Sequence, residues 1–191
     1  MSEPRTRLAA DDRKAQIIEH ATRMIAATGY QGFSMSALAE ACGLTRAGVT
    51  HHVGSKQELL IEVLRGKERE SSRESQVAIE RAGRQDPREV LDLLMRRNIA
   101  RPEIVRLFTV LAAESISTDH PAHDYFVDRI RRGARQLAPL FVDHSPDPEG
   151  MAIEILSFMD GIQLNWLRDP EIDIWARWTA FADRCLGARD G

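Results

Sequence analysis

The amino-acid sequence predicts an all-α protein of about nine helices. Apolar residues recur at three- and four-residue spacing through nearly the whole chain, and no run alternates between apolar and polar residues as a half-buried strand does. Cap residues, glycines and prolines divide this pattern into segments of helical length. We therefore expect a helical domain at the N-terminus and a larger helical domain after it.

Three helices are expected before residue 54. The first covers residues 11–28, carries an apolar face and stops at Gly29. A short second helix begins after the N-cap Ser34. A third begins at Thr45, again a cap residue, and ends near residue 53. Two short helices so close together predict a compact three-helix unit.

A fourth helix begins at a capping box, in which Ser55 and Glu58 satisfy each other's free amides. Its apolar face ends near Leu64, and residues 65–74 are almost wholly polar. We interpret this stretch as a solvated helix that leaves one domain for another. The expected division is an N-terminal domain over 1–54, the start of a linking helix to about 64, and a C-terminal domain over 65–191.

The C-terminal domain has its own start and stop signals. Each expected helix begins at a cap residue or at a proline, which suits the first helical position. The expected starts are Asp86–Pro87, Pro102, Pro121, Pro148 and Asp173, and the last helix ends at Gly187.

Composition indicates a folded cytoplasmic protein. Of 191 residues, 43% are hydrophobic and 29% charged, and no apolar run is long enough to span a bilayer or to form a secretory signal. Cys42 and Cys185 lie far apart within helical patterns, so we expect two buried thiols in a reducing compartment and no disulfide. The net charge is −3, but residues 1–66 carry 8 Lys/Arg against 7 Asp/Glu, which permits a local basic surface.

The segment 34–56, SMSALAEACGLTRAGVTHHVGSK, has the pattern of a helix-turn-helix. Gly43 supplies the turn conformation that a residue with a Cβ resists. Leu38, Leu44 and Val49 are spaced to fill the space between the two helices. The second of these helices is the one that such motifs insert into the major groove.

Five polar residues on and after this helix are candidate DNA contacts. Thr45 and the free amides of the helix N-terminus suit a phosphate, and Arg46 can reach a guanine edge with two hydrogen bonds. Thr50 and His51 can touch a base edge or a phosphate. The positive charge of Lys56 lies in the first turn of its helix, where the helix dipole is also positive. A nearby phosphate would offset this unfavourable interaction. Whether an N-terminal arm with Arg5, Arg7, Arg13 and Lys14 also contacts DNA stays open.

The stretch GYQGFSMSALAEACGLTRAGVTHHVGSKQELL resembles the TetR family of repressors. The resemblance covers residues 10–64 closely and the rest only in helix number and order. It implies a homodimer that binds operator DNA and is released by a small-molecule effector. By position it assigns DNA contacts to Ser34, Ser36, Thr45, Arg46, His51 and Lys56, with His52 packed inward. Thr50 stands where an aromatic residue is common, Val53 where phenylalanine is common, and Gly48 where the family often has a contacting side chain.

The last two helices are apolar on more than one side, so more than one side of each must be buried against other helices. The resemblance implies that they form a four-helix bundle with a second subunit, which would place two reading helices about 34 Å apart. The expected interface residues are Ile155, Leu156, Met159, Gln163, Trp175, Trp178 and Phe181.

The middle helices are expected to enclose an effector site with apolar walls and few polar groups. The candidate lining residues are Leu94, Asn98, Phe108, Leu111, Glu114, Ser115, Tyr125, Phe126, Met159 and Trp166. Asn98 and Glu114 are the strongest of these, because burying them without a partner is costly. We expect a moderately apolar effector.

Other functions have less support in the sequence. His120 and His123, with Asp119 and Asp124, lack the further fixed ligand of a metal site, so we interpret them as a polar helix start. No phosphate loop, dinucleotide motif or nucleophile elbow is present, so we expect neither an enzyme nor a cofactor. The alternative is a helical protein-interaction module or a small-molecule-binding protein that does not bind DNA.

Overall fold

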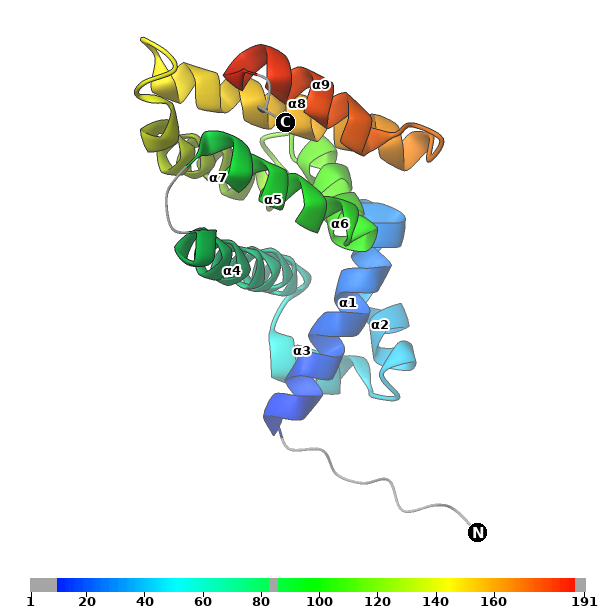
Figure 1. Cartoon of the computed structure of the whole chain (residues 1–191). Coiled ribbons are helices and arrows are strands. Elements are labelled where there is room, and N and C mark those ends of the chain that lie inside the picture. Colours follow the sequence, from blue (N-terminus) through cyan, green and yellow to red (C-terminus); the bar gives the residue numbers. More distant parts are fainter. Residues whose placement is uncertain (1–9, 83–85, 188–191) are drawn as a thin grey trace.

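The computed structural model describes residues 10–82 and 86–187, which form nine α-helices and one short 3-10 helix without a strand (Figure 1). The predicted all-α fold is therefore confirmed. No helix within the described residues is both long and apolar enough to cross a membrane. The elements in chain order are α1 (Ala10–Gly32), α2 (Met35–Ala41), α3 (Arg46–Val53), α4 (Lys56–Ala82), α5 (Pro87–Ile99), α6 (Pro102–Glu114), α7 (His123–Leu137), η1 (Ala138–Phe141), α8 (Pro148–Arg168) and α9 (Ile174–Leu186).

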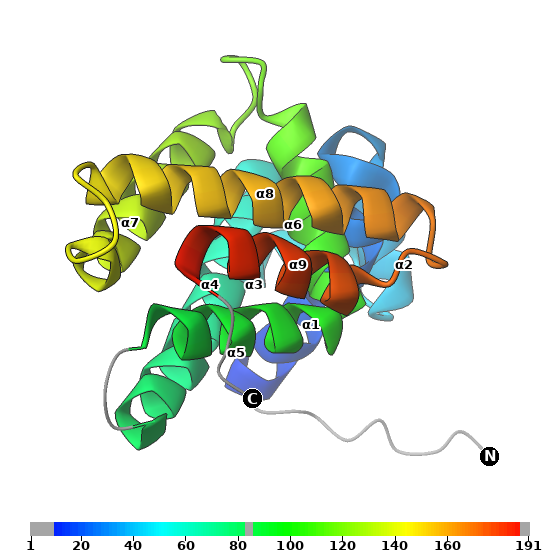
Figure 2. The same cartoon turned by 45° about the horizontal axis from the view of Figure 1, so that its top comes forward.

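The short helices lie at one end of the molecule and the last two helices at the other. Figure 1 shows α2 and α3 beside the lower half of α1, and α8 and α9 at the top. In Figure 2, α8 and α9 lie side by side across the front of the molecule, and α9 lies next to α5. Helix α1 packs along α6, so α1 and α6 connect the two ends.

The expected cap residues begin the helices as predicted. Ser34 Oγ accepts a hydrogen bond from the amide of Ala37 at 3.4 Å, and Thr45 Oγ1 accepts from the amide of Gly48 at 3.0 Å. In the capping box, Glu58 Oε2 lies 2.7 Å from the amide nitrogen of Ser55, whose Oγ lies 3.2 Å from the amide nitrogen of Glu58. These local bonds set the entry of each helix in the N-terminal part.

The structure differs from the sequence prediction at three places. Helix α1 does not stop at Gly29 but kinks there, with φ at 71°, and continues to Gly32. Helix α7 begins at His123 and not at Pro121, because the amide of Ala122 is held by the imidazole of His120 in a preceding turn. Cys185 is exposed and not buried as expected, since it lies near the C-terminal end of α9 on its outer side.

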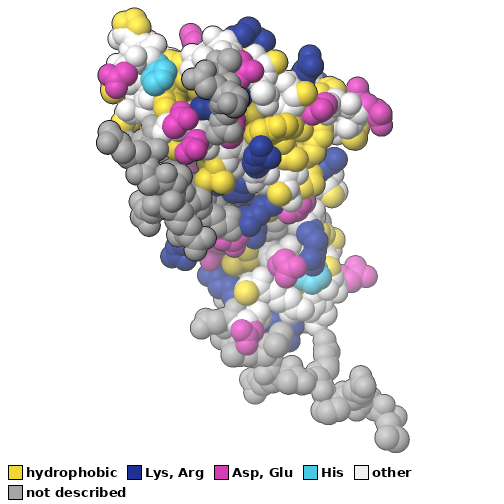
Figure 3. Space-filling model, in the orientation of Figure 1, with side chains coloured by type: hydrophobic (Ala, Val, Ile, Leu, Met, Phe, Trp, Pro, Cys, Tyr) yellow, Lys and Arg dark blue, Asp and Glu magenta, His cyan; other side chains and the backbone are white. Residues whose placement is uncertain are grey.

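Two hydrophobic cores support the fold. The first joins α1–α4 with Leu107 and Leu111 of α6 and Tyr125 of α7. The second joins α5 and α7 with α8 and α9 around Trp178. On the face shown in Figure 3, hydrophobic side chains gather over the upper, C-terminal helices. The first core crosses from the N-terminal helices into α6 and α7, and the division near residues 54–64 stays a prediction.

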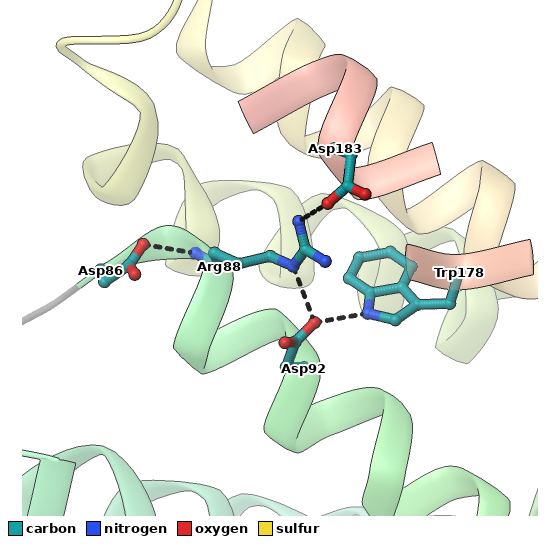
Figure 4. Close-up of polar contacts among 5 residues, drawn as sticks. All are labelled: Asp86, Arg88, Asp92, Trp178 and Asp183. Atoms are coloured by element: carbon teal, nitrogen blue, oxygen red, sulfur yellow. Dashed lines mark hydrogen bonds and ion pairs between the residues drawn. The ribbon is translucent and has the colours of Figure 1, made fainter. Parts of the chain in front are cut away.

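A buried polar network fastens α9 to α5 (Figure 4). Asp92 Oδ1 accepts hydrogen bonds from Arg88 Nε at 3.0 Å and from the indole nitrogen of Trp178 at 2.7 Å. Arg88 Nη1 also donates to Asp183 Oδ1 at 2.6 Å. A charged pair in a core is stable only when its hydrogen bonds are satisfied, and here three donors and two carboxylates satisfy one another.

Candidate nucleic-acid interface

The turn between α2 and α3 is built around Gly43, whose φ of 63° favours a residue without a Cβ. The amide of Gly43 donates to the carbonyl of Glu40 at 3.0 Å, and the amide of Leu44 donates to that of Ala39 at 2.8 Å. Leu38 of α2 and Val49 of α3 are fully buried between the helices. The sequence pattern therefore corresponds to a formed helix-turn-helix.

Helix α3 has one buried face and one polar exposed face. Val49 and Val53 are buried against α1 and α2, whereas the polar candidates are all exposed. The hydroxyl of Thr45 accepts the amide of Gly48 and can still donate its own proton to a phosphate. The exposed candidates on this helix are Thr45, Arg46, Thr50 and His51.

The N-terminus of α2 carries Ser34 and Ser36, both exposed. His52 of α3 is half-buried, and its ring meets the ring of His51 edge-on with 5.5 Å between centroids. The two serines, Thr45 and the amides at the two helix starts are all hydrogen-bond donors. Such donors suit the phosphates of a nucleic acid.

Lys56 has partners that the sequence did not indicate. Its ammonium group lies 4.4 Å from the centroid of the Tyr30 ring and 5.8 Å from that of Phe33. An ammonium group over an aromatic face is attracted by the negative potential of the ring. These contacts fix the position of a cation whose side chain is only half-buried.

The corner that carries Tyr30 is held from the C-terminal part. The amide of Tyr30 donates to Glu114 Oε2 at 2.7 Å, and a Cβ on Gly29 would overlap the same carboxylate. The His120 ring packs edge-on against Tyr30 with 5.1 Å between centroids. Glu114, expected at the effector site, thus binds the backbone of α1.

The expected effector residues are distributed over both cores. Phe108, Leu111, Tyr125 and Phe126 belong to the first core, and Leu94, Met159 and Trp166 to the second. Asn98 Nδ2 donates to Gln163 Oε1 at 3.3 Å, and Ser115 Oγ donates to the carbonyl of Ala112 at 2.9 Å. Their role in binding an effector stays a prediction.

Two grooves on the surface are lined by other residues. One, of about 540 Å³, runs along α4 to the loop before α7 and is lined by Gln57, Glu58, Ile61, Glu62, Arg65, Arg69 and Pro121. The other, of about 310 Å³, lies between the start of α8 and the end of α9, and its lining includes His144, Glu154, Phe181 and Cys185. No expected effector residue lines either groove.

The expected dimer residues divide by burial. Ile155, Met159, Gln163 and Trp178 are buried within the protomer, so their side chains cannot form an outer surface. Leu156, Trp175 and Phe181 are half-buried. The sequence could not separate the two groups, because a helix that is apolar all round gives no sign of which side faces its own core, and the interface stays a prediction.

The basic residues of the expected N-terminal arm are placed only in part. Arg5 and Arg7 lie outside the described residues. Arg13 and Lys14 lie in the first turns of α1, where Arg13 Nη1 donates to Gln16 Oε1 at 2.7 Å. The ammonium group of Lys14 pairs with Glu62 Oε1 on α4 at 2.6 Å.

Comparison with protein families matches residues 17–63 to the model described as bacterial regulatory proteins, tetR family. This span contains most of α1, all of α2 and α3, and the first turns of α4. A comparison with curated protein sequences finds no match.

The whole chain is similar to solved structures of regulators. A putative transcriptional regulator from Saccharomonospora viridis in complex with choline is 19% identical, with a TM-score of 0.79 over 94% of this chain and 100% of that one. A putative TetR-family regulator from Rhodococcus sp. is 20% identical, with a TM-score of 0.73 over 92% and 99%. AibR, solved with isovaleryl coenzyme A and operator DNA, is 21% identical, with a TM-score of 0.63 over 93% and 100%.

These similarities confirm the resemblance that the N-terminal sequence indicated. The family model covers the helix-turn-helix and the corner at Tyr30, and the solved structures cover the C-terminal helices as well. Residues 17–63 of this chain match the tetR family model, and the chain shares its fold with solved structures of TetR-family transcriptional regulators.

Proposed function

We propose that this protein is a TetR-like repressor that binds operator DNA as a homodimer and leaves it when a small-molecule effector binds. The observation that carries the proposal is the division of α3 into two faces. Val49 and Val53 hold one face in the core, and the other presents Thr45, Arg46 and His51 to solvent. A reading helix needs this arrangement, because its apolar side must be held while its polar side enters the groove.

Each polar residue has a role set by its chemistry. Arg46, in the first turn of α3, would reach the base edges, where a guanidinium can bind guanine O6 and N7 together. Thr45, with the N-terminal amides, would hold a phosphate, and Ser34 and Ser36 would do the same at the start of α2. Lys56 would contribute a phosphate contact from the first turn of α4.

We propose that the dimer forms through the outer face of α8 and α9. Ile153 on this side of the protomer is 44% exposed, although it is a large aliphatic residue. Phe158 of α8 and Phe181 of α9 stack with 3.7 Å between centroids and remain half-buried. A Cβ added to Gly161 would meet nothing, so a second helix can approach closely there. Leu156 and Trp175, which the sequence predicts at the interface, would flank this contact between the two subunits.

The effector would bind among the middle helices of the C-terminal part. Two of the similar structures were solved with a small molecule, one with choline and one with isovaleryl coenzyme A, which supports a ligand role for this fold. We propose that Asn98, Tyr125, Phe126 and Trp166 take part, and that the effector is moderately apolar. Binding would favour a dimer whose two reading helices no longer match successive grooves. A regulator of this kind acts in the cytoplasm, where the DNA lies.

The first experiment is selection of DNA duplexes from a random pool, followed by titration of the enriched duplex at several salt concentrations. We expect enrichment of a sequence with two related half-sites about one helical turn apart. Affinity should fall steeply with salt, and Lys56→Ala should reduce the slope of log K against log salt by about 1. Absence of any enriched duplex, with a folded dimer in solution, would reject DNA binding and favour a protein-interaction module.

A further inference from the structure

At the kink of α1, Tyr30 is contacted both from the C-terminal helices and from α4. On one side, Glu114 Oε2 accepts the Tyr30 amide at 2.7 Å, and the His120 ring meets the Tyr30 ring at 79°. On the other side, the ammonium group of Lys56 lies 4.4 Å from the centroid of the same ring. Tyr30 therefore connects the end of α6 with a proposed DNA contact.

The imidazole of His120 is in a neutral form in this arrangement. Its Nδ1 accepts a hydrogen bond from the amide of Ala122 at 3.2 Å, so that nitrogen carries a lone pair and the ring proton is on Nε2. Nε2 is buried, has no hydrogen-bond partner among the described residues, and lies 3.8 Å from Glu114 Oε2, which is too far for a hydrogen bond. The side chain is 2% exposed.

Protonation disfavours this arrangement. A proton on Nδ1 would face the Ala122 amide, so that two donors would meet where one bond now exists. Burial lowers the pKa of His120, and the Glu114 carboxylate opposes this effect in part. A histidine with a lowered folded pKa stabilises the structure above its unfolded value of about 6.5. That contribution is lost as the pH falls from there toward the folded pKa.

Titratable groups on α4, α6 and α7 lie around this corner. Glu114 lies on α6 and His123 begins α7, where its Nδ1 is 2.8 Å from the carbonyl oxygen of Ser115. On α4, Lys56 lies beyond the Tyr30 ring, and Glu58 and Glu62 line the groove next to Pro121. Of these, Glu114 is the group whose charge acts on the pKa of His120.

We propose that Glu114 and His120 are positioning residues for Lys56, that they hold Tyr30 beneath its ammonium group, and that this clamp opens when His120 binds a proton. The inference rests on the proposed DNA contact of Lys56. A loosened Tyr30 no longer fixes the ammonium group, so part of the DNA affinity is lost as the solution becomes acidic. His51 and His52 lie on α3 in every variant compared below, so any contribution they make to DNA binding is common to all of them.

The test compares wild type with His120→Asn, whose side-chain oxygen can take the place of Nδ1 but does not titrate. His144→Asn, at an exposed histidine far from the corner, is the matched control. Affinity for the enriched duplex is measured by fluorescence anisotropy from pH 7.5 to 5.5. We expect wild type and the control to lose about fivefold more affinity over this range than His120→Asn. Parallel pH profiles of all three proteins would overturn the proposal.

A second variant separates the clamp from the DNA contact. Glu114→Gln keeps an oxygen for the Tyr30 amide but removes the charge that favours protonated His120. In thermal unfolding followed against pH, its acid-induced loss of stability should be larger than that of wild type and extend to lower pH, because the folded pKa of His120 is lowered further while its unfolded value is unchanged. An unchanged curve would contradict the clamp. If wild type binds no duplex at any pH, the proposed function has failed, whereas the unfolding curves still test the clamp.

Discussion

The network that fastens α9 to α5 makes a strong prediction about stability. Substitution Asp92→Ala removes the acceptor of both Arg88 Nε and the Trp178 indole nitrogen, and all three side chains are buried. The guanidinium keeps a partner in Asp183, but the indole N–H is left in the core without one.

The expected cost follows from what is left unpaired. Breaking a buried ion pair by removing one partner costs about 3–5 kcal/mol, and the lower end applies here because Asp183 still neutralises Arg88. The abandoned indole N–H adds about 1–3 kcal/mol. We therefore expect Asp92→Ala to lower the free energy of unfolding by about 4 kcal/mol. Asp92→Asn keeps an acceptor oxygen and loses only the charge, so it should cost about 2 kcal/mol.

The matched control is Asp183→Asn, which removes the outer carboxylate of the same network. The Asp183 side chain is 39% exposed, so solvent screens its pairing and the cost should be about 0–1 kcal/mol. The measurement is urea-induced unfolding followed by tryptophan fluorescence, at one protomer concentration for all variants because dissociation of a dimer shifts the midpoint. The reasoning is refuted if Asp92→Ala costs no more than Asp183→Asn.

Three further predictions follow from the described contacts. Ser55 lowers the pKa of Glu58 through its backbone amide and its hydroxyl. Glu58 therefore stabilises α4 fully above about pH 4.3, and this contribution is lost as the pH falls through the folded pKa of Glu58. Glu58→Gln should remove that part of the acid dependence in a pH series of melting temperatures. Ile153→Arg should convert the dimer to monomer in sedimentation, with helicity unchanged, and a persistent dimer would exclude the proposed face. Gly29→Ala should lower the melting temperature, because φ there is 71° and a Cβ would displace Glu114; an unchanged value would show that the kink is not strained.

The N-terminal part could be predicted in detail because its determinants are local. Ser34, Thr45 and the box at Ser55 and Glu58 act within three residues of the helices they cap, so the sequence alone places them. The turn at Gly43 and the alternation of buried and exposed positions on α3 are equally local. For these reasons the polar face of α3 was predictable before the structure.

Contacts between distant segments had no such signal. Tyr30 and Glu114 are separated by more than eighty residues, and neither carries a pattern that names the other. The glycine before Tyr30 was visible in the sequence, but it indicated a helix end and not the carboxylate that lies against it. The orientation of α8 and α9 was unpredictable for a related reason, because Met159 and Trp178 are as apolar as the residues that face outward.

The measurement that tests the central claim most directly is the ratio of affinities for the enriched duplex and for a scrambled duplex, in wild type and in Arg46→Ala. Arg177→Ala, at an exposed arginine of α9, is the control. If Arg46 reads base edges from α3, its loss should reduce the ratio about 5- to 150-fold, which corresponds to about 1–3 kcal/mol of discrimination. The control should keep the wild-type ratio. An unchanged ratio in Arg46→Ala would mean that this face of α3 does not read DNA.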